Sequence, residues 1–269
     1  DGEPHTSEDW MFRYYDRDSN EELVSAISTS LVSFVDGERV PATLEAPDAF
    51  TIVWKFQMPK ALFNYVGGYA TRSYNAYPKH YLKNYHADYA DKGELEQMAA
   101  DQDMEDWTQL FGMMNDIGRN QERPVVDPWV EVNDWTNEVI WLDRNPYFWT
   151  VDTAGNQLPY IERLQYREFS DSQIYLMWVA NGEIDCQSRH ARSWANFTVL
   201  KENEANGDYG VQLWRGTRVA SIHFNMTTKN ERLAELYRER DFRVAISHAC
   251  DRDEMIDLLL DGNATQMQH

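Results

Sequence analysis

The segment RNPYFWTVDTAGNQLPYIERLQY, from Arg144 to Tyr166, holds the strongest local signals in the chain. Asn145-Pro146 ends the strand before it, because proline lacks a backbone donor and restricts the residue that precedes it. Asp152 to Asn156, DTAGN, has the composition of a turn, and the residues from Tyr160 onward alternate between apolar and polar as a strand does. The segment therefore predicts a strand, an exposed loop tip and a returning strand.

Three consecutive aromatic residues, Tyr147, Phe148 and Trp149, follow the proline and allow two interpretations. They could form a stacking platform for a ligand, or they could pack the loop onto the body of the domain. We expect packing, with Trp149 buried, so that its replacement by alanine would remove a few kcal/mol of stability. A Trp149→Ala variant that stayed stable but lost ligand binding would favour the platform.

Strands and helices alternate along the rest of the chain. A turn over residues 1–6 leads into a first helix, and apolar spacing and caps predict helices over residues 19–34, 171–181 and 241–260, with residues 78–120 mostly helical. Alternation and turn residues predict strands over residues 39–47, 50–59, 123–132, 137–145, 160–169, 184–186, 210–216 and 219–226. This order favours a mixed α/β fold, of the α+β kind, over a β-sandwich or a helical bundle.

The composition suits a globular protein with a large core. Hydrophobic residues make up 42% and aromatic residues 13% of the 269 residues, with ten Trp and fifteen Tyr. No run of about 18 apolar residues occurs, so the sequence predicts no membrane span. The formal net charge of −20 repels phosphate backbones and argues against nucleic-acid binding, although it leaves the attraction of cationic ligands open.

Motifs for metal binding and catalysis are incomplete. Asp16, Asp18 and Asn20 begin like a calcium loop, but the glycine and the bidentate glutamate that complete such a loop are missing. Cys186 and Cys250 fit no zinc spacing and are expected to be small buried residues, with a long-range disulfide left open. No GxSxG elbow or phosphate-binding loop occurs. We therefore expect no metal, no cofactor and no catalytic residue. The alternative is an enzyme, a secreted glycosidase or peptidase.

Six stretches carry a resemblance when they are taken in order. They are DGEPHTSEDWMFRYYD, LEAPDAFTIVWKF, LDRNPYFWTVDTAGNQLPYIERLQYREFSDS, WVANGEIDC, IHFNMT and DFRVAISHACDRDEMIDLLLDGNAT. Together they resemble the large bacterial solute-binding proteins of ABC importers, family 5, the oligopeptide and dipeptide group. The ordered set is specific and covers nearly the whole chain. One departure is RPVVDPWV, Arg123 to Val130, where the family often has a glycine-rich sequence.

The resemblance implies a periplasmic-binding-protein-like fold of type II, in which two lobes close around a ligand by a hinge. This chain would be the middle portion of such a protein, without its natural start and most of the second lobe. Residues 1–118 would form part of a small extra domain of the first lobe, and residues 119–220 an α/β segment of the first lobe. Residues 221–269 would cross the hinge and start the second lobe.

The resemblance also implies a function, the extracytoplasmic solute-binding component of an ABC importer, in the periplasm or as a cell-surface lipoprotein. The protein would bind an oligopeptide-like solute by hinge closure, break no bond, and present the solute to the membrane permease. An oligosaccharide is the alternative solute, because Trp and Tyr suit stacking on sugars. We expect a monomer that has no nucleic-acid partner.

Four residues are the expected ligand contacts within this resemblance. Residues 217–225 would cross between the lobes, and clefts at domain interfaces are the usual ligand sites. Trp129 is a stacking candidate, because it lies where the chain would re-enter the first lobe. The other three candidates are Arg218, Ser221 and His223.

Three further residues are expected to serve the hinge or the scaffold. Asn225 would fix the turn of the hinge strand into the second lobe. Asp251 and Arg252 would lie in the middle of a helix and make a local or interlobe ion pair. A fourth motif is GEID, Gly182 to Asp185. It would end a helix and start a buried strand.

Overall fold

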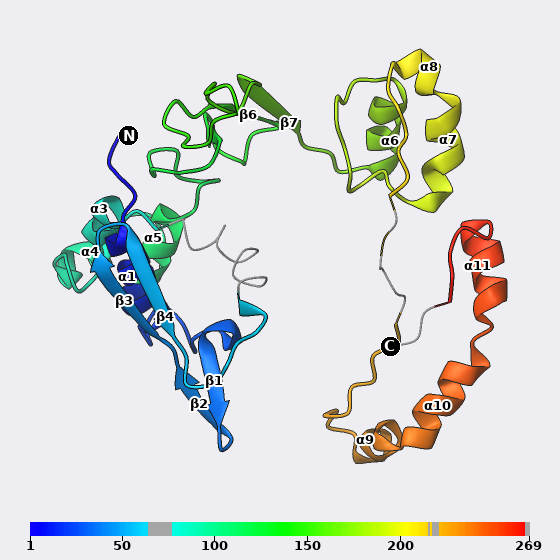
Figure 1. Ribbon diagram of the computed structural model, residues 1–269, viewed down its shortest axis with the longest axis horizontal. Coiled ribbons are helices and arrows are strands. Elements are labelled where there is room, and N and C mark those ends of the chain that lie inside the picture. The colour runs from blue at the N-terminus through cyan, green and yellow to red at the C-terminus, as the bar shows by residue number, and fades with distance from the viewer. Residues whose placement is uncertain (64–76, 215, 217–220, 267–269) are drawn as a thin grey trace. The chain divides into compact units, whose positions relative to one another are not determined.

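The computed structural model describes residues 1–63, 77–214, 216 and 221–266 (Figure 1). The chain forms two compact units, Asp1–Glu168 and Phe169–His269, and each is described here by itself. Helices and strands are both present, so the predicted mixed α/β class is confirmed. The domain boundaries expected after residues 118 and 220 stay predictions.

The first unit begins with a turn that leads into a helix, as the sequence predicts. Thr6 precedes α1 (Ser7–Met11), and its hydroxyl oxygen accepts a hydrogen bond from the backbone N–H of Glu8. Asp9 acts in return, because its carboxylate accepts from the backbone N–H of Thr6 at 2.7 Å. This reciprocal capping fixes the start of the helix, which continues as a π-helical segment over Phe12–Asp18.

The helix predicted over residues 19–34 is wrong. Its C-terminal part forms a short 3₁₀ turn, Thr29–Leu31, and the strand β1 (Val32–Val35), which pairs antiparallel with β2 (Glu38–Pro41). The turn between the strands explains the error. Asp36 and Gly37 have φ angles of 52° and 87°, the conformation of the two-residue turns that match the twist of a hairpin. Hairpin pairing therefore overrides the helical spacing of the apolar residues.

A second hairpin, β3 (Thr43–Asp48) and β4 (Thr51–Lys55), confirms a pair of strands on either side of the turn near residue 48. The single strand predicted over residues 39–47 is wrong, because it is divided between β2 and β3. Figure 1 shows α1 beside this hairpin, and the two are in contact. The helix and the two hairpins share a small core. Its buried members are Tyr14, Leu31 and Leu44, and Ile27, Ile52 and Trp54 are among the residues that pack against them.

The main core of the first unit lies among helices, as the pattern of residues 78–120 predicts. They include α3 (Lys79–Leu82), α4 (Lys92–Ala100) and α5 (Trp107–Met114). Asp91 and Asp106 cap α4 and α5, because their carboxylates accept from backbone N–H groups in the first turn. The buried side chains of this core are Phe12, Tyr77, Leu82, Leu95, Ala99, Trp107, Leu110 and Phe111.

A three-stranded antiparallel sheet completes the first unit, in the order β5 (Trp129–Glu131), β6 (Val139–Arg144) and β7 (Arg163–Arg167). All three strands lie where the sequence predicts them. Residues 145–162 join β6 to β7, and Val151 pairs with Gln157 as an isolated bridge within them. The predicted strand, loop and returning strand are therefore confirmed, and backbone bonds from Leu158 to Thr150 and from Asp152 to Asn156 pair the two sides of the loop tip.

The second unit opens with α6 (Ser172–Ala180), which Asp171 caps by accepting from the backbone N–H of Gln173 at 2.7 Å. Gly182 follows the helix with a φ of 74°, as the sequence predicts for a helix end. Two short helices, α7 (Phe197–Glu202) and α8 (Glu204–Gly207), are in contact with α6. The buried side chains shared among these elements are Tyr175, Leu176, Val179, Ala191 and Leu200.

Three strands predicted for this unit are wrong wherever the structure describes them. Residues 184–186 are irregular, and neither 210–214 nor 221–226 forms a strand. A strand needs a neighbour to satisfy its backbone N–H and C=O groups. The described residues of the second unit include no strand that could serve as that neighbour. A local pattern cannot reveal whether a neighbour exists.

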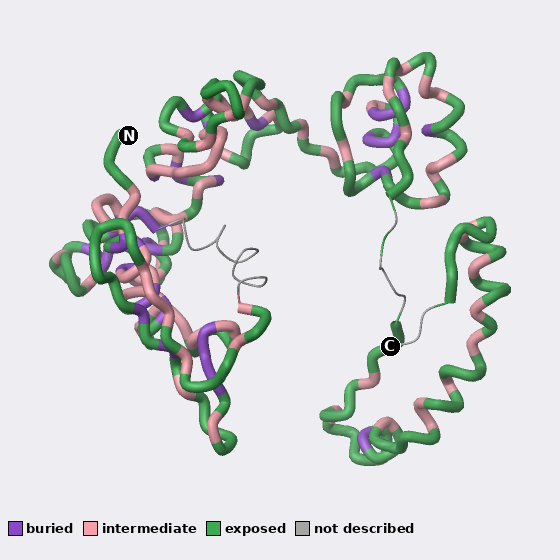
Figure 2. Tube along the Cα trace, in the orientation of Figure 1, coloured by how far each residue is buried: buried purple, intermediate pink, exposed green. Residues whose placement is uncertain are grey.

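The single helix predicted over residues 241–260 is two helices, α10 (Arg240–Ala249) and α11 (Arg252–Leu260). Asp251 separates them, because its backbone is extended and its carboxylate accepts from the N–H of Glu254 at 3.0 Å. This cap starts a new helix where the apolar spacing had predicted a continuous one. All residues of α10 and α11 are described, and none of them is buried (Figure 2).

Candidate functional site

Two of the predicted ligand contacts lie together in the second unit. Ser221 and His223 are both exposed, and the Ser221 Oγ lies 2.7 Å from the His223 Nε2. Which of the two side chains donates the hydrogen bond depends on the tautomer of the imidazole. It therefore presents a polar group that can serve either a donor or an acceptor on a ligand. Arg218, the third candidate from this segment, lies outside the described residues.

Trp129, the predicted stacking residue, is the first residue of β5 and is half-buried. Its indole N–H donates to the carbonyl oxygen of Ile161 at 3.0 Å. The polar edge of the ring therefore holds the end of the loop that precedes β7. The sequence could not indicate this contact, because 32 residues separate the partners.

Asn225, a predicted hinge residue, makes a local turn. Its side-chain oxygen accepts from the backbone N–H of Thr227 at 3.2 Å and from the Thr227 hydroxyl at 3.0 Å. This is the asparagine turn that competes with regular secondary structure. It lies between the irregular residues 221–224 and α9 (Glu231–Arg238). The strand that the prediction placed before this turn does not form, and the part of Asn225 in a hinge stays a prediction.

Asp251 and Arg252 do not lie in the middle of a helix, so that expectation is wrong. Asp251 is the cap of α11. Arg252 is the first residue of α11, and its guanidinium donates to the carbonyl oxygen of Ser247 at 2.8 Å and to the Ser247 hydroxyl at 2.6 Å. The guanidinium thus satisfies a carbonyl at the end of α10, where a positive charge also suits the helix dipole. Both residues hold the junction between the two helices.

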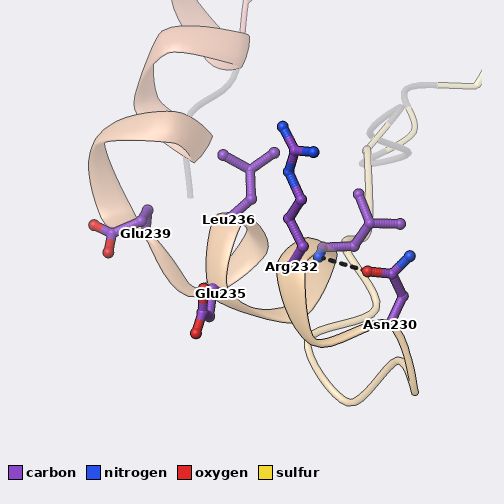
Figure 3. Close-up of a pocket in the computed structure, with 6 residues that line it drawn as sticks. Asn230, Arg232, Glu235, Leu236 and Glu239 are labelled. Carbon is purple, nitrogen blue, oxygen red and sulfur yellow. Dashed lines mark hydrogen bonds between the residues drawn. The ribbon is translucent and has the colours of Figure 1, made fainter.

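A surface hollow of about 660 Å³ lies along α9 (Figure 3). Asn230 caps this helix by accepting from the backbone N–H of Leu233 at 3.2 Å. The hollow has one wall, since its lining comes from a single helix and its caps, whereas ligand sites usually converge from several elements. None of the predicted contact residues lines it. Its lining residues are Asn230, Arg232, Leu233, Glu235, Leu236 and Glu239.

The aromatic block of the loop is not packed as expected. Trp149 is 76% exposed and Tyr147 is 64% exposed, while Phe148 between them is half-buried. Exposure alternates along these residues, since Tyr147, Trp149 and Val151 are exposed while Phe148 and Thr150 are half-buried. The prediction that Trp149 is buried is therefore wrong.

Asp152 organises this loop. Its Oδ1 accepts from the backbone N–H groups of Ala154 and Asn156 at 2.8 Å, and its Oδ2 accepts from the Asn156 amide at 2.9 Å and from the Tyr160 hydroxyl. The bonds from Tyr160 and Asn156 hold the pKa of Asp152 well below its usual range, and the carboxylate raises the pKa of Tyr160. The spacing of DTAGN predicts the turn, but not the bond to Tyr160.

The two cysteines are free. Cys250 is half-buried, and Cys186 is exposed. The expectation that both are small buried residues is therefore wrong for Cys186. The reason is that residues 184–186 do not form the buried strand predicted for them.

Among the helices that the structure describes, none is long and apolar enough to cross a membrane.

Comparison with known proteins gives relatives of one kind. A periplasmic alpha-galactoside-binding protein of Rhizobium meliloti (strain 1021) is 27% identical over 98% of this chain and 36% of its own length. A probable ABC transporter-binding protein of Deinococcus radiodurans is 31% identical over 45% of this chain and 21% of its own length. This chain therefore spans well under half of either relative.

Solved structures agree in fold. The oligopeptide-binding protein OppA has a TM-score of 0.73 and 32% identity, over 98% of this chain and 41% of its own. The periplasmic binding protein MelB of Agrobacterium fabrum C58, in complex with stachyose, has a TM-score of 0.64 and 24% identity, over 97% of this chain and 37% of its own. These neighbours confirm the predicted periplasmic-binding-protein-like fold.

The family match covers every residue. The family described as bacterial extracellular solute-binding proteins, family 5 Middle, matches residues 1–269. The relatives and the solved structures are binding proteins of the same kind. The chain therefore belongs to the bacterial extracellular solute-binding proteins, family 5, as its sequence resemblance implies.

Proposed function

We propose that this chain is part of the solute-binding component of an ABC importer that captures an oligopeptide-like solute outside the cytoplasm. The observation that carries the proposal is the family match over residues 1–269. OppA, a protein named for oligopeptide binding, supports a peptide as the solute, because it is 32% identical over 98% of this chain. The protein would act as a monomer, close two lobes around the solute, break no bond and deliver the solute to the permease.

Ser221 and His223 are the contacts that we propose for polar groups of the solute. Their side chains are exposed and already share a hydrogen bond of 2.7 Å. A peptide offers amide N–H and C=O groups, which such a pair can match in either direction. Trp129 and Arg218 remain proposed contacts, for stacking and for a negative charge or carbonyl. Asn225 is the proposed hinge residue.

An oligosaccharide is the second candidate for the solute. The supporting observation is the relative from Rhizobium meliloti, named for alpha-galactoside binding, which aligns with 98% of this chain. The chain also has ten Trp and fifteen Tyr, which are the residues that stack on sugar rings. Both candidate solutes fit the same family, so an experiment must separate them.

Thermal unfolding of the full-length protein, with and without candidate solutes, tests the proposal. A solute at 100 times its Kd should stabilise the folded protein by about 2.7 kcal/mol, because it binds only the native state. We expect short peptides to raise the Tm. A rise with alpha-galactosides alone would replace the peptide by the sugar. Cleavage of peptides or glycans would instead indicate an enzyme.

A further inference from the structure

The tip of the first hairpin is a two-residue turn, Asp36-Gly37, that joins β1 to β2. Both residues have positive φ angles, of 52° and 87°, and both are exposed. Within the described part of the chain, neither the Asp36 carboxylate nor the Gly37 N–H makes a hydrogen bond. A β-carbon on Gly37 would meet no described atom within 4 Å beyond its chain neighbours, so the backbone here is open to approach.

An aspartate followed by a glycine carries both partners of an intramolecular reaction. The Gly37 nitrogen is already bonded to the main-chain carbonyl carbon of Asp36, and a second bond to the side-chain carboxyl carbon closes a five-membered ring. Glycine has no side chain to hinder this attack. Because both groups belong to one chain, the attack is unimolecular and needs no encounter between molecules. The hairpin tip therefore has the chemistry for a spontaneous modification.

Two asparagine–glycine pairs with the same chemistry, Asn181-Gly182 and Asn206-Gly207, are restrained at helix ends. Gly182 and Gly207 each donate their N–H to a carbonyl oxygen three or four residues earlier, at 3.0 Å and 2.9 Å. The two glycines also pack against each other, because a β-carbon on Gly182 would overlap the Gly207 carbonyl oxygen. Their nitrogens cannot turn toward the neighbouring side chain unless these contacts break.

The two remaining aspartate–glycine pairs, Asp1-Gly2 and Asp261-Gly262, are also restrained. The Asp1 carboxylate is engaged at both oxygens, by a backbone N–H at 3.2 Å and by the His80 ring at 2.7 Å. The Asp261 carboxylate accepts from an indole N–H at 2.8 Å, and the glycine after it donates its N–H to a carbonyl oxygen of α11 at 3.2 Å. Of the five such pairs, all within the described residues, only the hairpin tip has both reacting groups unrestrained.

The hairpin that carries this turn opens easily. It is a two-stranded sheet with four residues in each strand. A two-stranded hairpin has little stability of its own, so its tip opens locally at a low cost in free energy. Opening lets the Gly37 nitrogen reach the side-chain carboxyl carbon of Asp36. Helix ends that are held by hydrogen bonds open less often.

We propose that Asp36 is the residue of this chain at which aspartate converts to isoaspartate without an enzyme. The Gly37 nitrogen bonds to the side-chain carboxyl carbon of Asp36 and loses its proton, while one carboxyl oxygen leaves as water. Water then opens the ring at either carbonyl. Opening at the main-chain carbonyl leaves the backbone running through the side-chain carbons, which is isoaspartate. No electron is transferred, and water is the only co-reactant.

The modification weakens the fold of the first unit. Isoaspartate lengthens the main chain of the turn by one carbon, so the Val35–Glu38 pair that closes the hairpin no longer fits a two-residue turn. The register of β1 against β2 then loosens. Val32 of β1 is 1% exposed, and Leu31 before it belongs to the small core under the hairpins. The change therefore reaches this core, and it does so independently of any solute.

Storage of the full-length protein at neutral pH, below its unfolding temperature, tests the proposal. Peptide mapping by mass spectrometry with electron-transfer dissociation locates isoaspartate, which has the same mass as aspartate but fragments differently. In the folded protein, Asp36 should hold about tenfold more isoaspartate than any of the other four pairs, because the hairpin tip opens at lower cost.

A matched pair of variants checks the assignment. Asp36→Gly should abolish this product and keep the hairpin, since Gly-Gly suits a two-residue turn. Asp261→Gly is the control, because Asp261 also has a positive φ, of 49°, and precedes a glycine. It should leave the isoaspartate at Asp36 unchanged. A total isoaspartate content that Asp36→Gly does not lower would overturn the proposal.

Storage in guanidinium chloride separates the effect of the structure from that of the sequence. Unfolding removes the hydrogen bonds at the helix ends, and an uncharged asparagine amide is attacked more readily than an ionised carboxylate. Asn181 and Asn206 should then convert faster than Asp36. The same order of conversion in the folded and the unfolded protein would overturn the proposal, because the structure would then have no part in selecting Asp36.

Discussion

Gly182 lies so close to Gly207 that a β-carbon on Gly182 would overlap the Gly207 carbonyl oxygen. Gly182 also has a φ of 74°, which residues with a side chain rarely adopt. Two independent reasons therefore require glycine at this position of GEID. The close approach brings the end of α6 against the end of α8. The atom that a β-carbon would meet is the backbone oxygen of Gly207, which cannot move away by a side-chain rotation.

Gly182→Ala should lower the free energy of unfolding by about 2–4 kcal/mol, because both the strained φ and the steric overlap must be relieved. Urea unfolding followed by circular dichroism measures this loss. Gly155→Ala is the matched control, since Gly155 has a φ of 85° but open space within 4 Å of where a β-carbon would lie. The control should lose only about 1–2 kcal/mol. Equal losses in the two variants would contradict the close packing at Gly182.

Trp149→Ala should change the free energy of unfolding by less than about 0.5 kcal/mol, because the side chain is largely in water. Trp107→Ala, by contrast, should lose about 3–5 kcal/mol, since Trp107 is 1% exposed and its indole N–H donates to Glu22 at 2.8 Å. Urea unfolding of both variants provides the comparison. A large loss in Trp149→Ala would restore the packing interpretation of the aromatic block.

Asp9 is a buried carboxylate that ties α1 to the start of α3. It accepts from the backbone N–H groups of Thr6 at 2.7 Å and Lys79 at 2.8 Å, and it lies 3.2 Å from the His5 Nδ1. Burial by itself raises the pKa of Asp9, but the bonds from His5, Thr6 and Lys79 outweigh it and lower the pKa overall. The ionised form therefore favours the folded state.

The stability contributed by the Asp9 charge should be complete above about pH 4, the ordinary carboxyl pKa, and should fall as the pH drops through the lower folded-state pKa. Asp9→Asn should accordingly be less stable than the unaltered protein at pH 7, and the difference should shrink as the solution is acidified. Urea unfolding at pH 7, 5 and 3.5 measures the trend. Asp241→Asn is the control, because the Asp241 side chain is 97% exposed. A difference for Asp9→Asn that does not depend on pH would refute this account.

His223→Ala should weaken solute binding by about tenfold, equivalent to about 1.4 kcal/mol, if the Ser221–His223 pair contacts the solute. Ser221→Ala should have a similar effect, because it removes the hydrogen-bond partner of the imidazole. Calorimetric titration of the full-length protein measures both. His248→Ala controls for loss of an exposed histidine, since His248 lies on α10 away from this pair in sequence. Unchanged affinity in His223→Ala and Ser221→Ala would remove both residues from the solute site.

The sequence predicts elements best where a local signal decides them. Asp171 and Gly182 mark the two ends of α6, and both the cap and the positive φ are found. The order β5, β6 and β7 also follows from alternation and turn residues. These features depend on neighbours a few residues away, which a sequence pattern contains.

The errors arise where a distant or missing partner decides the structure. Residues 184–186 look like a strand, but the described part of their unit offers no strand to pair with. Trp149 looks like a core residue, but Asp152 and Gln157 hold the loop from inside and leave the ring outside. Of the predicted ligand contacts, Ser221 and His223 lie within hydrogen-bond distance of each other. Trp129 donates to the carbonyl oxygen of Ile161, a contact that no local sequence pattern could indicate.

The measurement that tests the central claim most directly is calorimetric titration of the full-length protein with defined short peptides, followed by recovery of the solute. We predict saturable binding of one peptide per protein molecule, with the peptide recovered intact. Saturable binding of alpha-galactosides in place of peptides would change the solute but keep the function. Binding of neither class, or recovery of a cleaved solute, would contradict the account.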